Sequence, residues 1–313
     1  MATHVPLFSI VTACKITDES GFEFFGATLK GVLAQSFSDW EWIIVDDASA
    51  RSIAEAFDLK DPRIRVIQND QGRGQTWSLN LGIREARSDW IVRVDGDDLL
   101  SPRRLEATRD ALEGAKLVFS DYRVIDEDGT WIADMILKKP LGSAFFNYLR
   151  GRNNPICHPT VAFLRRDTNG EILQYREDLK NAQDYELWKR ILSQFGESAF
   201  RCVSELLVDY RLVASSLSGA RAHEQKDELD AIRTGREVEP VTQSQALGGR
   251  EREAMHAFRV LYYRFASAKQ VPWSRSDLSL LRKAVAHRPV VTKAVAYFLL
   301  RGLGTPSRRA LFR

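Results

Sequence analysis

The sequence predicts an α/β protein with a doubly wound, mostly parallel sheet. Short apolar runs alternate with amphipathic stretches through residues 1–125, which is the pattern of β-α-β units. The segments between the apolar runs are long enough to hold crossover helices, and such helices must cover both faces of a parallel sheet. With 313 residues, of which 44% are hydrophobic and 28% charged, the chain is large enough to bury such a core.

Five apolar runs are predicted as strands, and four of the segments between them as helices. The strands are Leu7–Ala13, Glu41–Val45, Ile64–Gln68, Trp90–Val94 and Lys116–Tyr122. The helices are Phe22–Gln35, Ser52–Phe57, Gln75–Ala86 and Arg103–Leu112. Later segments predict a hairpin turn at Asp126–Trp131, a helix at Asn181–Gly196 and a strand at Leu206–Val213.

The composition of the chain changes near residue 218. We expect residues 1–218 to form the α/β domain, in two halves of 1–125 and 126–218, and residues 219–313 to form a helical C-terminal extension. The net charge is +3, and eight basic but no acidic residues follow Asp277, so the preceding part carries −5. An acidic body with a basic tail suggests that the two parts meet different partners.

The apolar stretch within residues 289–304 is shorter than the roughly 20 residues that a membrane-spanning helix needs. Its basic flanks fit a helix that lies on an anionic membrane surface. A helix packed on the domain or in a dimer interface fits equally well. Both interpretations stay open.

The cysteines and the N-terminus indicate a reducing compartment. Cys14, Cys157 and Cys202 are odd in number and far apart, and the chain has no CxxC pair, so we expect neither a disulfide framework nor a zinc site. The first residues lead directly into a strand without the pattern of a signal peptide. We therefore expect a cytoplasmic protein, with peripheral contact at the inner face of the cell membrane if the tail binds lipid.

Carboxylates are concentrated where two of the predicted strands end. Asp46 and Asp47 follow one strand, and Asp95, Asp97 and Asp98 follow another within four positions. In open α/β sheets ligands bind outside the carboxyl ends of the strands, so both groups should face one crevice. The alternative interpretation is structural, because aspartate is common in turns and at helix N-termini.

Three like charges so close together repel one another unless a cation neutralises them. An oxygen-only site with few protein ligands suits Mg²⁺ or Mn²⁺, which one or two carboxylates hold together with substrate phosphates. The twelve-residue spacing of a calcium loop is absent, and so are a Walker A motif and a GxGxxG after a strand. The pattern therefore predicts a phosphorylated ligand that the metal itself grips.

Five motifs of the chain, in order, resemble those of family 2 glycosyltransferases with the GT-A fold. The resemblance covers residues 6–218. It implies a Rossmann-like nucleotide-binding half followed by an acceptor half, and inverting transfer of a sugar from a nucleotide-diphosphate donor. The motifs are "FSIVTACKI", "LAQSFSDWEWIIVDDAS", "SLNLGIREARSDWIVRVDGDDLLSPRRLE", "NPICHPTVAFLRR" and "QDYELWKRI".

The resemblance also implies roles for residues at the donor site. Asp95 and Asp97 match the family's DxD pair, with Asp97 on the metal and Asp95 on the ribose or on the metal through water. Asp98 is left to capping or to support of the pair. The other implied donor-site residues are Thr12, Asp46 and Asp47 at the base and ribose, Asn80 and Arg93 beside the nucleotide, and Arg211 at the pyrophosphate.

For the catalytic step, the resemblance implies that Asp184 is the general base. The family's preceding glutamate is Gln183 here. His158 is a candidate contact for acceptor or phosphate, although a single histidine is often structural. The family's histidine after the Arg211 motif is Val213 here, which weakens the far side of the expected metal site.

These features predict an inverting glycosyltransferase that uses Mn²⁺ or Mg²⁺ and a UDP-sugar. Its acceptor would be a saccharide or a lipid-linked molecule in cell-surface polysaccharide or glycolipid synthesis, and we expect no nucleic-acid partner. One alternative is a non-catalytic relative that only binds nucleotides. A sugar nucleotidyltransferase is another, but the basic glycine-rich loop expected after its first strand is missing.

Overall fold

The computed structural model describes residues 4–151, 154–213, 228–232, 234 and 249–266. The chain forms two compact units. The first unit consists of residues 1–120 and 154–209, and the second of residues 121–153 and 210–313. The predicted division at residue 218 stays a prediction, because residues 214–227 lie outside the described part.

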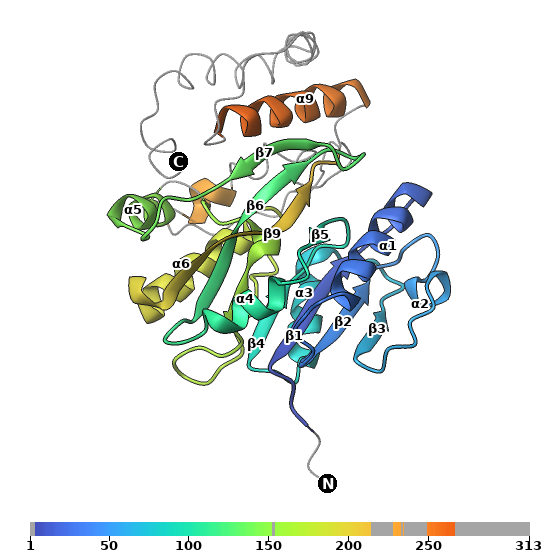
Figure 1. Cartoon of the computed structure of the whole chain (residues 1–313), viewed down its shortest axis with the longest axis horizontal. Coiled ribbons are helices and arrows are strands. Elements are labelled where there is room, and N and C mark those ends of the chain that lie inside the picture. The colour runs from blue at the N-terminus through green and yellow to red at the C-terminus, as the bar shows by residue number, and fades with distance from the viewer. Residues whose placement is uncertain (1–3, 152–153, 214–227, 233, 235–248, 267–313) are drawn as a thin grey trace. The chain divides into compact units, whose positions relative to one another are not determined.

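The first unit contains four parallel strands in the order β3-β2-β1-β4 (Figure 1). Their bounds are Phe8–Cys14 (β1), Trp40–Asp46 (β2), Ile64–Gln68 (β3) and Trp90–Arg93 (β4). The helices between them are Glu19–Leu33 (α1), Ile53–Ala56 (α2) and Gln75–Glu85 (α3). This arrangement confirms the predicted α/β class and places the ends of β1, β2 and β4 side by side.

The remaining strands make the sheet mixed, in the order β3-β2-β1-β4-β8-β6-β9-β5. β8 lies antiparallel to both β4 and β6, and β5 lies antiparallel to β9. The parallel pattern therefore ends at β4, because the strand on its other side, β8, runs antiparallel to it. The bounds are Leu99–Leu100 (β5), Leu117–Ile125 (β6), Ala162–Leu164 (β8) and Phe200–Arg211 (β9). Arg104–Asp110 (α4), His158–Thr160 (η1), Gln183–Phe195 (α6) and Glu197–Ala199 (η2) complete this part.

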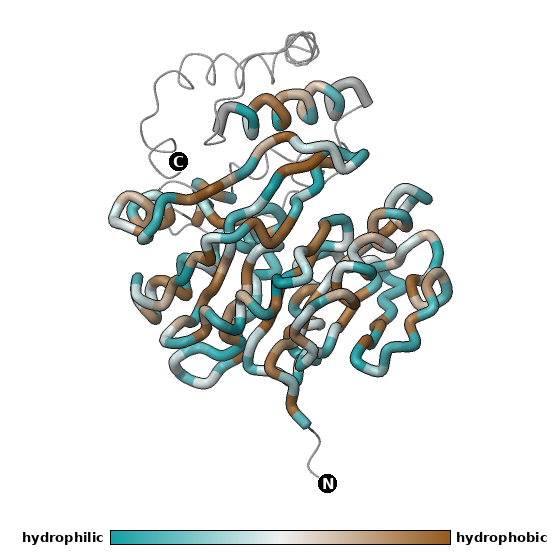
Figure 2. The backbone as a smooth tube through the Cα atoms, in the orientation of Figure 1, coloured by the Kyte–Doolittle hydropathy of each residue, from teal (hydrophilic) through white to brown (hydrophobic). Residues whose placement is uncertain are grey.

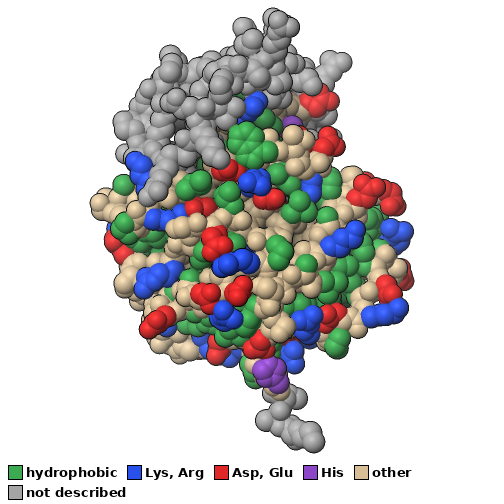
Figure 3. Space-filling model, viewed as in Figure 1, with side chains coloured by type: hydrophobic (Ala, Val, Ile, Leu, Met, Phe, Trp, Pro, Cys, Tyr) green, Lys and Arg blue, Asp and Glu red, His purple; other side chains and the backbone are tan. Residues whose placement is uncertain are grey.

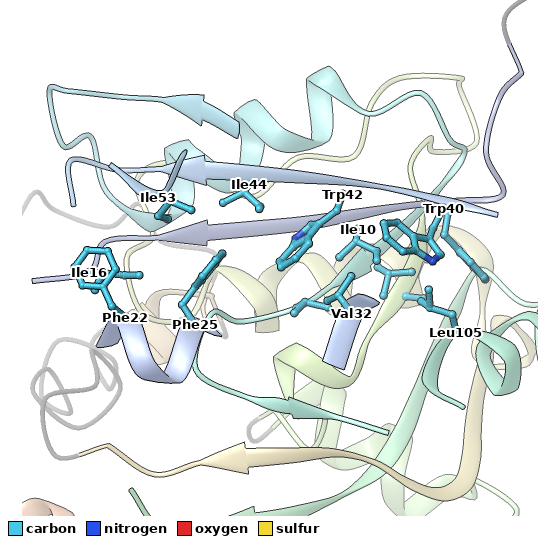
Figure 4. Packing of buried hydrophobic residues seen from close by; sticks show 14 residues of the cluster. Ile10, Ile16, Phe22, Phe25, Val32, Trp40, Trp42, Ile44, Ile53 and Leu105 are labelled. Carbon is cyan, nitrogen blue, oxygen red and sulfur yellow. The ribbon is translucent and has the colours of Figure 1, made fainter. Parts of the chain in front are cut away.

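An apolar layer lies between α1 and the strands β1 and β2 (Figure 4). Phe25 of α1 stacks on Trp42 of β2, with 5.9 Å between the ring centroids. Hydrophobic residues concentrate along the strands, and the connecting loops are largely hydrophilic (Figure 2). Burying each such aromatic side chain stabilises the fold by about 1.5–3 kcal/mol, so this layer fixes the strands that carry the predicted site residues.

On the opposite face of the sheet, α3 packs closely against β1. A Cβ atom on Gly82 would lie 2.5 Å from Cγ1 of Val11. No real side chain tolerates that separation, so glycine is required for this approach. Helices on both faces agree with the predicted doubly wound arrangement.

The second unit holds the end of β6, β7 (Trp131–Met135), α5 (Ser143–Gly151) and α9 (Gly249–Ala266). β7 pairs with β6 as the hairpin predicted around Asp126–Trp131. α9 packs against β7 and its Arg259 donates to the Tyr210 hydroxyl (3.0 Å). α9 agrees with a predicted helix of the extension.

Two boundaries differ from the sequence predictions for local reasons. α1 begins three residues earlier than predicted, because the Asp18 carboxylate accepts from the backbone N–H of Gly21 (3.0 Å) and caps the helix. β9 begins six residues earlier, since several of its polar residues are exposed and hide the apolar alternation.

The part of the predicted helical extension beyond residue 266, including the apolar stretch within residues 289–304, lies outside the described residues. Among the residues that are described, no helix is both long enough and apolar enough to cross a membrane. Acidic and basic side chains are interspersed on the face that Figure 3 shows.

Candidate active site

The carboxylates after β4 differ in their access to solvent. Asp95 and Asp97 are half-buried, whereas Asp98 is fully buried. The backbone carbonyl of Asp98 accepts from the hydroxyl of Thr28 in α1 (2.7 Å), which ties this loop to the helix. Asp95 and Asp97 are therefore more accessible to a ligand than Asp98, and the predicted division of roles among the three stays a prediction.

Cys14, at the end of β1, shows that the acidic groups gather in one place. Burial raises the pKa of its thiol well above the ordinary value, and four nearby carboxylates raise it further. These carboxylates belong to Asp46, Asp97, Asp95 and Asp47. The ends of β1, β2 and β4 thus meet in a single negatively charged region, as the sheet order requires.

Asp46 and Asp47 both serve as acceptors for backbone groups. The carboxylate of Asp46 accepts from the N–H groups of Ser49 and Ile53, each at 3.0 Å, and so holds the start of α2. Between them Ala48 has a φ of 63°, in the left-handed region that favours glycine. The carboxylate of Asp46 has no exposed surface, so its visible role is to shape the turn.

Asp47 organises the loop that leads into α3. Its carboxylate accepts from the N–H groups of Arg73 (2.9 Å) and Gly74 (2.8 Å), from the Ser78 hydroxyl (3.0 Å) and from the Asn69 amide (2.5 Å). The negative charge also lies at the N-terminus of α3, where the helix dipole stabilises it. The predicted contacts of the pair with a nucleotide stay predictions.

Thr12 lies on β1, and its hydroxyl both donates and accepts a hydrogen bond within the protein. Its hydroxyl donates to the Val94 carbonyl (2.8 Å) and accepts from Nε1 of Trp42 (2.9 Å). The side chain is fully buried. It therefore joins β1 to its two neighbours, and its predicted contact with the nucleotide stays a prediction.

Asp184 lies in the first turn of α6, far along the sequence from the carboxylates that follow β4. Its Oδ2 accepts from the amide of Asn154 (2.6 Å), and its Oδ1 accepts from the N–H of Tyr185 (2.7 Å). Burial raises the pKa of Asp184 to about 6, and the charge of Asp95 contributes. The fold thus brings Asp184 within electrostatic reach of Asp95, and its pKa suits a general base.

Arg93 is fully buried and forms an ion pair with Asp95. One guanidinium nitrogen lies 2.5 Å from Oδ1 of Asp95, another donates to the Val11 carbonyl, and Nε donates to Nε2 of His158 (3.1 Å). Burial, with the nearby Arg93 charge, lowers the pKa of His158 well below the ordinary value. His158 is thus neutral and accepts a hydrogen bond within the protein through Nε2. Its predicted contact with the sugar acceptor or a phosphate stays a prediction, and only Nδ1 is left to make that contact.

Two residues near the site were missed by the sequence analysis. The Tyr175 hydroxyl lies 2.8 Å from Nε2 of His158, and Asn154 holds Asp184. No motif marks Tyr175, while Asn154 lies within the quoted "NPICHPTVAFLRR" motif. Asn80 is predicted to lie beside the nucleotide. Its side-chain amide donates to the backbone carbonyl of Tyr175 and accepts from the backbone N–H of the same residue (2.8 Å each).

Arg211 and Val213 belong to the second unit. The guanidinium of Arg211 donates to the carbonyl oxygens of Asp126 (3.3 Å) and Glu127 (2.7 Å) in the same unit. The predicted contact of Arg211 with a pyrophosphate, and the effect of valine at position 213, stay predictions.

The donor set of the site fits a hard divalent cation. Within the described ranges, no three histidine, cysteine, aspartate or glutamate side chains are grouped so that they could bind a metal by themselves. Asp95 and Asp97 supply carboxylate oxygens from the exposed side of the acidic region. Mg²⁺ and similar ions are commonly held by one or two carboxylates and completed by substrate phosphates and water, so these two residues suffice for that kind of site.

The mixed α/β sheet, with carboxylates at the ends of its parallel strands, agrees with the GT-A fold that the sequence motifs imply. The sequence profile described as Glycosyl transferase family 2 matches residues 10–173, just over half of the chain. The chain therefore belongs to glycosyl transferase family 2 and is a glycosyltransferase, as the sequence motifs indicated.

The chain is also similar to named proteins over most of its length. TuaG of Bacillus subtilis (strain 168), named for teichuronic acid biosynthesis, is 27% identical over 70% of this chain and 84% of its own. WfgD of Escherichia coli, a UDP-Glc:alpha-D-GlcNAc-diphosphoundecaprenol beta-1,3-glucosyltransferase, is 24% identical over 66% and 79%. The crystal structure of S. aureus TarS 1-349 in complex with UDP aligns with a TM-score of 0.56 and 13% identity over 92% of this chain and 87% of that one, which supports the fold.

Proposed function

We propose that this glycosyltransferase moves a sugar, with inversion, from a uridine-diphosphate donor to an acceptor hydroxyl. The acceptor would be a saccharide or lipid-linked intermediate in the assembly of a cell-surface polysaccharide or glycolipid. The names of TuaG and WfgD support this class of product, and the UDP complex of TarS supports the donor. The single observation that carries the proposal is the half-buried carboxylate of Asp184, held by Asn154 at the start of α6, whose pKa of about 6 lets it take a proton near neutral pH.

In the proposed reaction, Asp184 removes the proton of the acceptor hydroxyl while the hydroxyl oxygen attacks the anomeric carbon. The bond from that carbon to the diphosphate oxygen breaks, and the nucleoside diphosphate leaves with the electron pair. Attack opposite the leaving group inverts the anomeric configuration, and a single base is sufficient. Asn154 holds one oxygen of Asp184 (2.6 Å), and this contact fixes the direction in which the carboxylate faces the acceptor.

Asp97 and Asp95 would hold Mn²⁺ or Mg²⁺ beside the donor. When bound, such a cation supplies positive charge to the diphosphate and so stabilises the departing group. Asp97 is the candidate for direct coordination, as the DxD resemblance implies, and Asp95, one oxygen of which pairs with Arg93, would bind the ribose or hold the ion through water. Thr12, Asp46, Asp47 and Asn80 support the nucleotide by fixing the strands and loops that surround it.

The proposal is tested with a panel of UDP-, GDP-, CMP- and dTDP-sugars, each with and without Mn²⁺. A ligand that binds only the folded state raises its unfolding temperature. We expect UDP-sugars with Mn²⁺ to give the largest increase and to be turned over when a polyprenyl-linked or oligosaccharide acceptor is present. If another base gives the largest increase, the uridine assignment is wrong, and if no nucleotide sugar binds, the proposed reaction is wrong.

A further inference from the structure

Arg93 carries a positive charge in a place where water cannot reach it. Its side chain has no exposed surface, while that of Asp95 is 21% exposed. A buried charge is tolerated only when it is paired and hydrogen-bonded, and the loss of one partner of a buried pair is strongly destabilising. The orientation of Arg93 is therefore tightly specified by the groups around it.

Three acceptors of the first unit surround the Arg93 guanidinium. Asp95 and the Val11 carbonyl each accept a hydrogen bond from a terminal nitrogen of Arg93, and Nε2 of His158 accepts one from Nε of Arg93 (3.1 Å). Because Nε2 accepts, it carries the lone pair, and the neutral ring holds its proton on Nδ1. The lowered pKa of His158 agrees with this assignment.

Tyr175 completes the group from the other side of His158. Its hydroxyl lies 2.8 Å from Nε2 of His158. Since Nε2 has only a lone pair to offer, the Tyr175 hydroxyl donates to it. Arg93 and Tyr175 thus converge on one histidine nitrogen, and each restricts the position of the other.

The far end of this group is anchored in the core. The Asn80 amide binds both the N–H and the carbonyl of Tyr175. Trp188 of α6 packs against the rings of His158 and Tyr175, with centroid distances of 6.0 Å and 6.5 Å. The path from α3 and α6 to Asp95 therefore consists of buried or half-buried contacts throughout.

We propose that Tyr175 and His158 are positioning residues for the donor site. They hold Arg93 in the orientation that pairs it with Oδ1 of Asp95, so that Asp95 presents only its other oxygen to the donor. This inference rests on the proposed function, because it assigns the two residues to binding of the nucleotide diphosphate. In this role they act through Arg93, and their effect on the reaction passes through Asp95.

The first test needs no ligand and uses ¹⁵N NMR of the full chain. His158 should remain neutral, with its proton on Nδ1, over the range of about pH 5 to 8. The Tyr175→Phe variant should increase the solvent exchange rate of the Arg93 Nε proton. A His158 ring protonated on Nε2 in the wild-type protein, or an unchanged Arg93 exchange rate in the variant, would overturn the proposal. The wild-type spectrum decides even if Tyr175→Phe fails to fold.

The second test is a double-mutant cycle with Mn²⁺ and UDP as the probe. Tyr175→Phe should weaken UDP binding about five- to tenfold in the wild-type background, the size of one lost hydrogen bond. The same change in an Asp95→Asn background should weaken it less than about twofold, because coupled residues are not additive. Equal factors in both backgrounds would mean that the effect of Tyr175 on UDP binding does not pass through Asp95 and would contradict the proposal.

Two controls separate positioning from packing. Tyr148→Phe makes the same chemical change on α5 in the second unit and should leave UDP affinity unchanged. Phe163→Leu loosens the packing against Tyr175 and Trp188 without removing a polar group, so it should lower stability more than affinity. If the wild-type protein binds no UDP, the proposed donor is wrong, while the NMR test still judges the contact between Tyr175, His158 and Arg93.

Discussion

The pKa of Asp184 is raised more by burial than by its charged neighbours. Loss of water around the carboxylate is the largest cause of its raised pKa, and the hydrogen bonds from Tyr185 and Asn154 oppose it. The result is a carboxylate that is ionised at neutral pH and still binds a proton readily, as the proposed base must. A helix-start aspartate in solvent would have a pKa near 4 and would accept a proton far less readily.

The pKa of Asp184 predicts the acid limb of the activity profile. The deprotonated form is the base, so kcat should fall as the pH drops through about 6, by about tenfold per pH unit below it. The measurement is kcat at saturating donor and acceptor between about pH 4.5 and 8, with folding checked at each pH. A kcat that stays constant below the pKa would rule out this carboxylate as the base.

Thr12 allows a test of whether a motif residue is structural. Thr12→Val removes the acceptor for Nε1 of Trp42 and leaves that buried donor unpaired, which should cost about 1–3 kcal/mol of unfolding free energy. Thr12→Ser keeps the hydroxyl and should cost clearly less. Urea unfolding of both variants measures the difference. An equal loss for valine and serine would show that the methyl group, not the hydroxyl, matters.

At the scale of elements, the sequence predicted most of the first unit. The alternation of apolar runs and amphipathic stretches located β1 to β4 and the helices between them. The short helix α5 was missed, and so was the first half of β9, where exposed polar residues hide the apolar alternation. The antiparallel place of β8 beside β4 depends on tertiary pairing that no local pattern encodes.

The close packing of α3 on β1 predicts a sensitive glycine. Gly82→Ala would place a Cβ atom 2.5 Å from Val11, so the helix must move away from the strand, and we expect a loss of about 1–3 kcal/mol. Gly151→Ala is the matched control, since among the described residues no atom beyond its own helix backbone and chain neighbours lies within 4 Å of its Cβ position at the end of α5. Thermal unfolding of both variants should show a lower midpoint for the first alone, and similar midpoints would contradict the packing.

The sequence could predict individual residues of the candidate site but not the hydrogen bonds between them. The motifs predict Asp95, Asp97 and Asp184 as site residues, and the fold brings Asp95 within electrostatic reach of Asp184. The internal hydrogen bonds of Asp46 and Asp47 could not be foreseen, because their donors come from loops whose conformation the sequence does not specify. Tyr175 was missed for the same reason, since its contact with His158 depends on how the loop before α6 folds back.

At the scale of the whole molecule, the charge distribution predicts separate roles for the body and the tail. The eight basic residues after Asp277 favour contact with an anionic surface, and a lipid-linked acceptor would give that contact a purpose. This part of the chain lies outside the described residues, so the prediction rests on sequence alone.

The membrane prediction is tested with liposomes that contain anionic or only zwitterionic lipids. Full-length protein should sediment with anionic liposomes at low salt, and the chain that lacks residues 289–313 should not. Binding should weaken as salt is added, because the attraction is electrostatic. If the full-length protein does not bind anionic liposomes, the tail has another role.

The measurement that tests the central claim most directly is a comparison of Asp184→Asn with the wild-type enzyme. The substitution keeps the shape of the side chain but removes its ability to take a proton. We predict that kcat falls by about 10²–10⁴, while the affinity for UDP with Mn²⁺ changes by less than about twofold. Asp110→Asn, an exposed carboxylate on α4, should leave both quantities unchanged. Undiminished turnover in Asp184→Asn would contradict the account, because the reaction would then have another base.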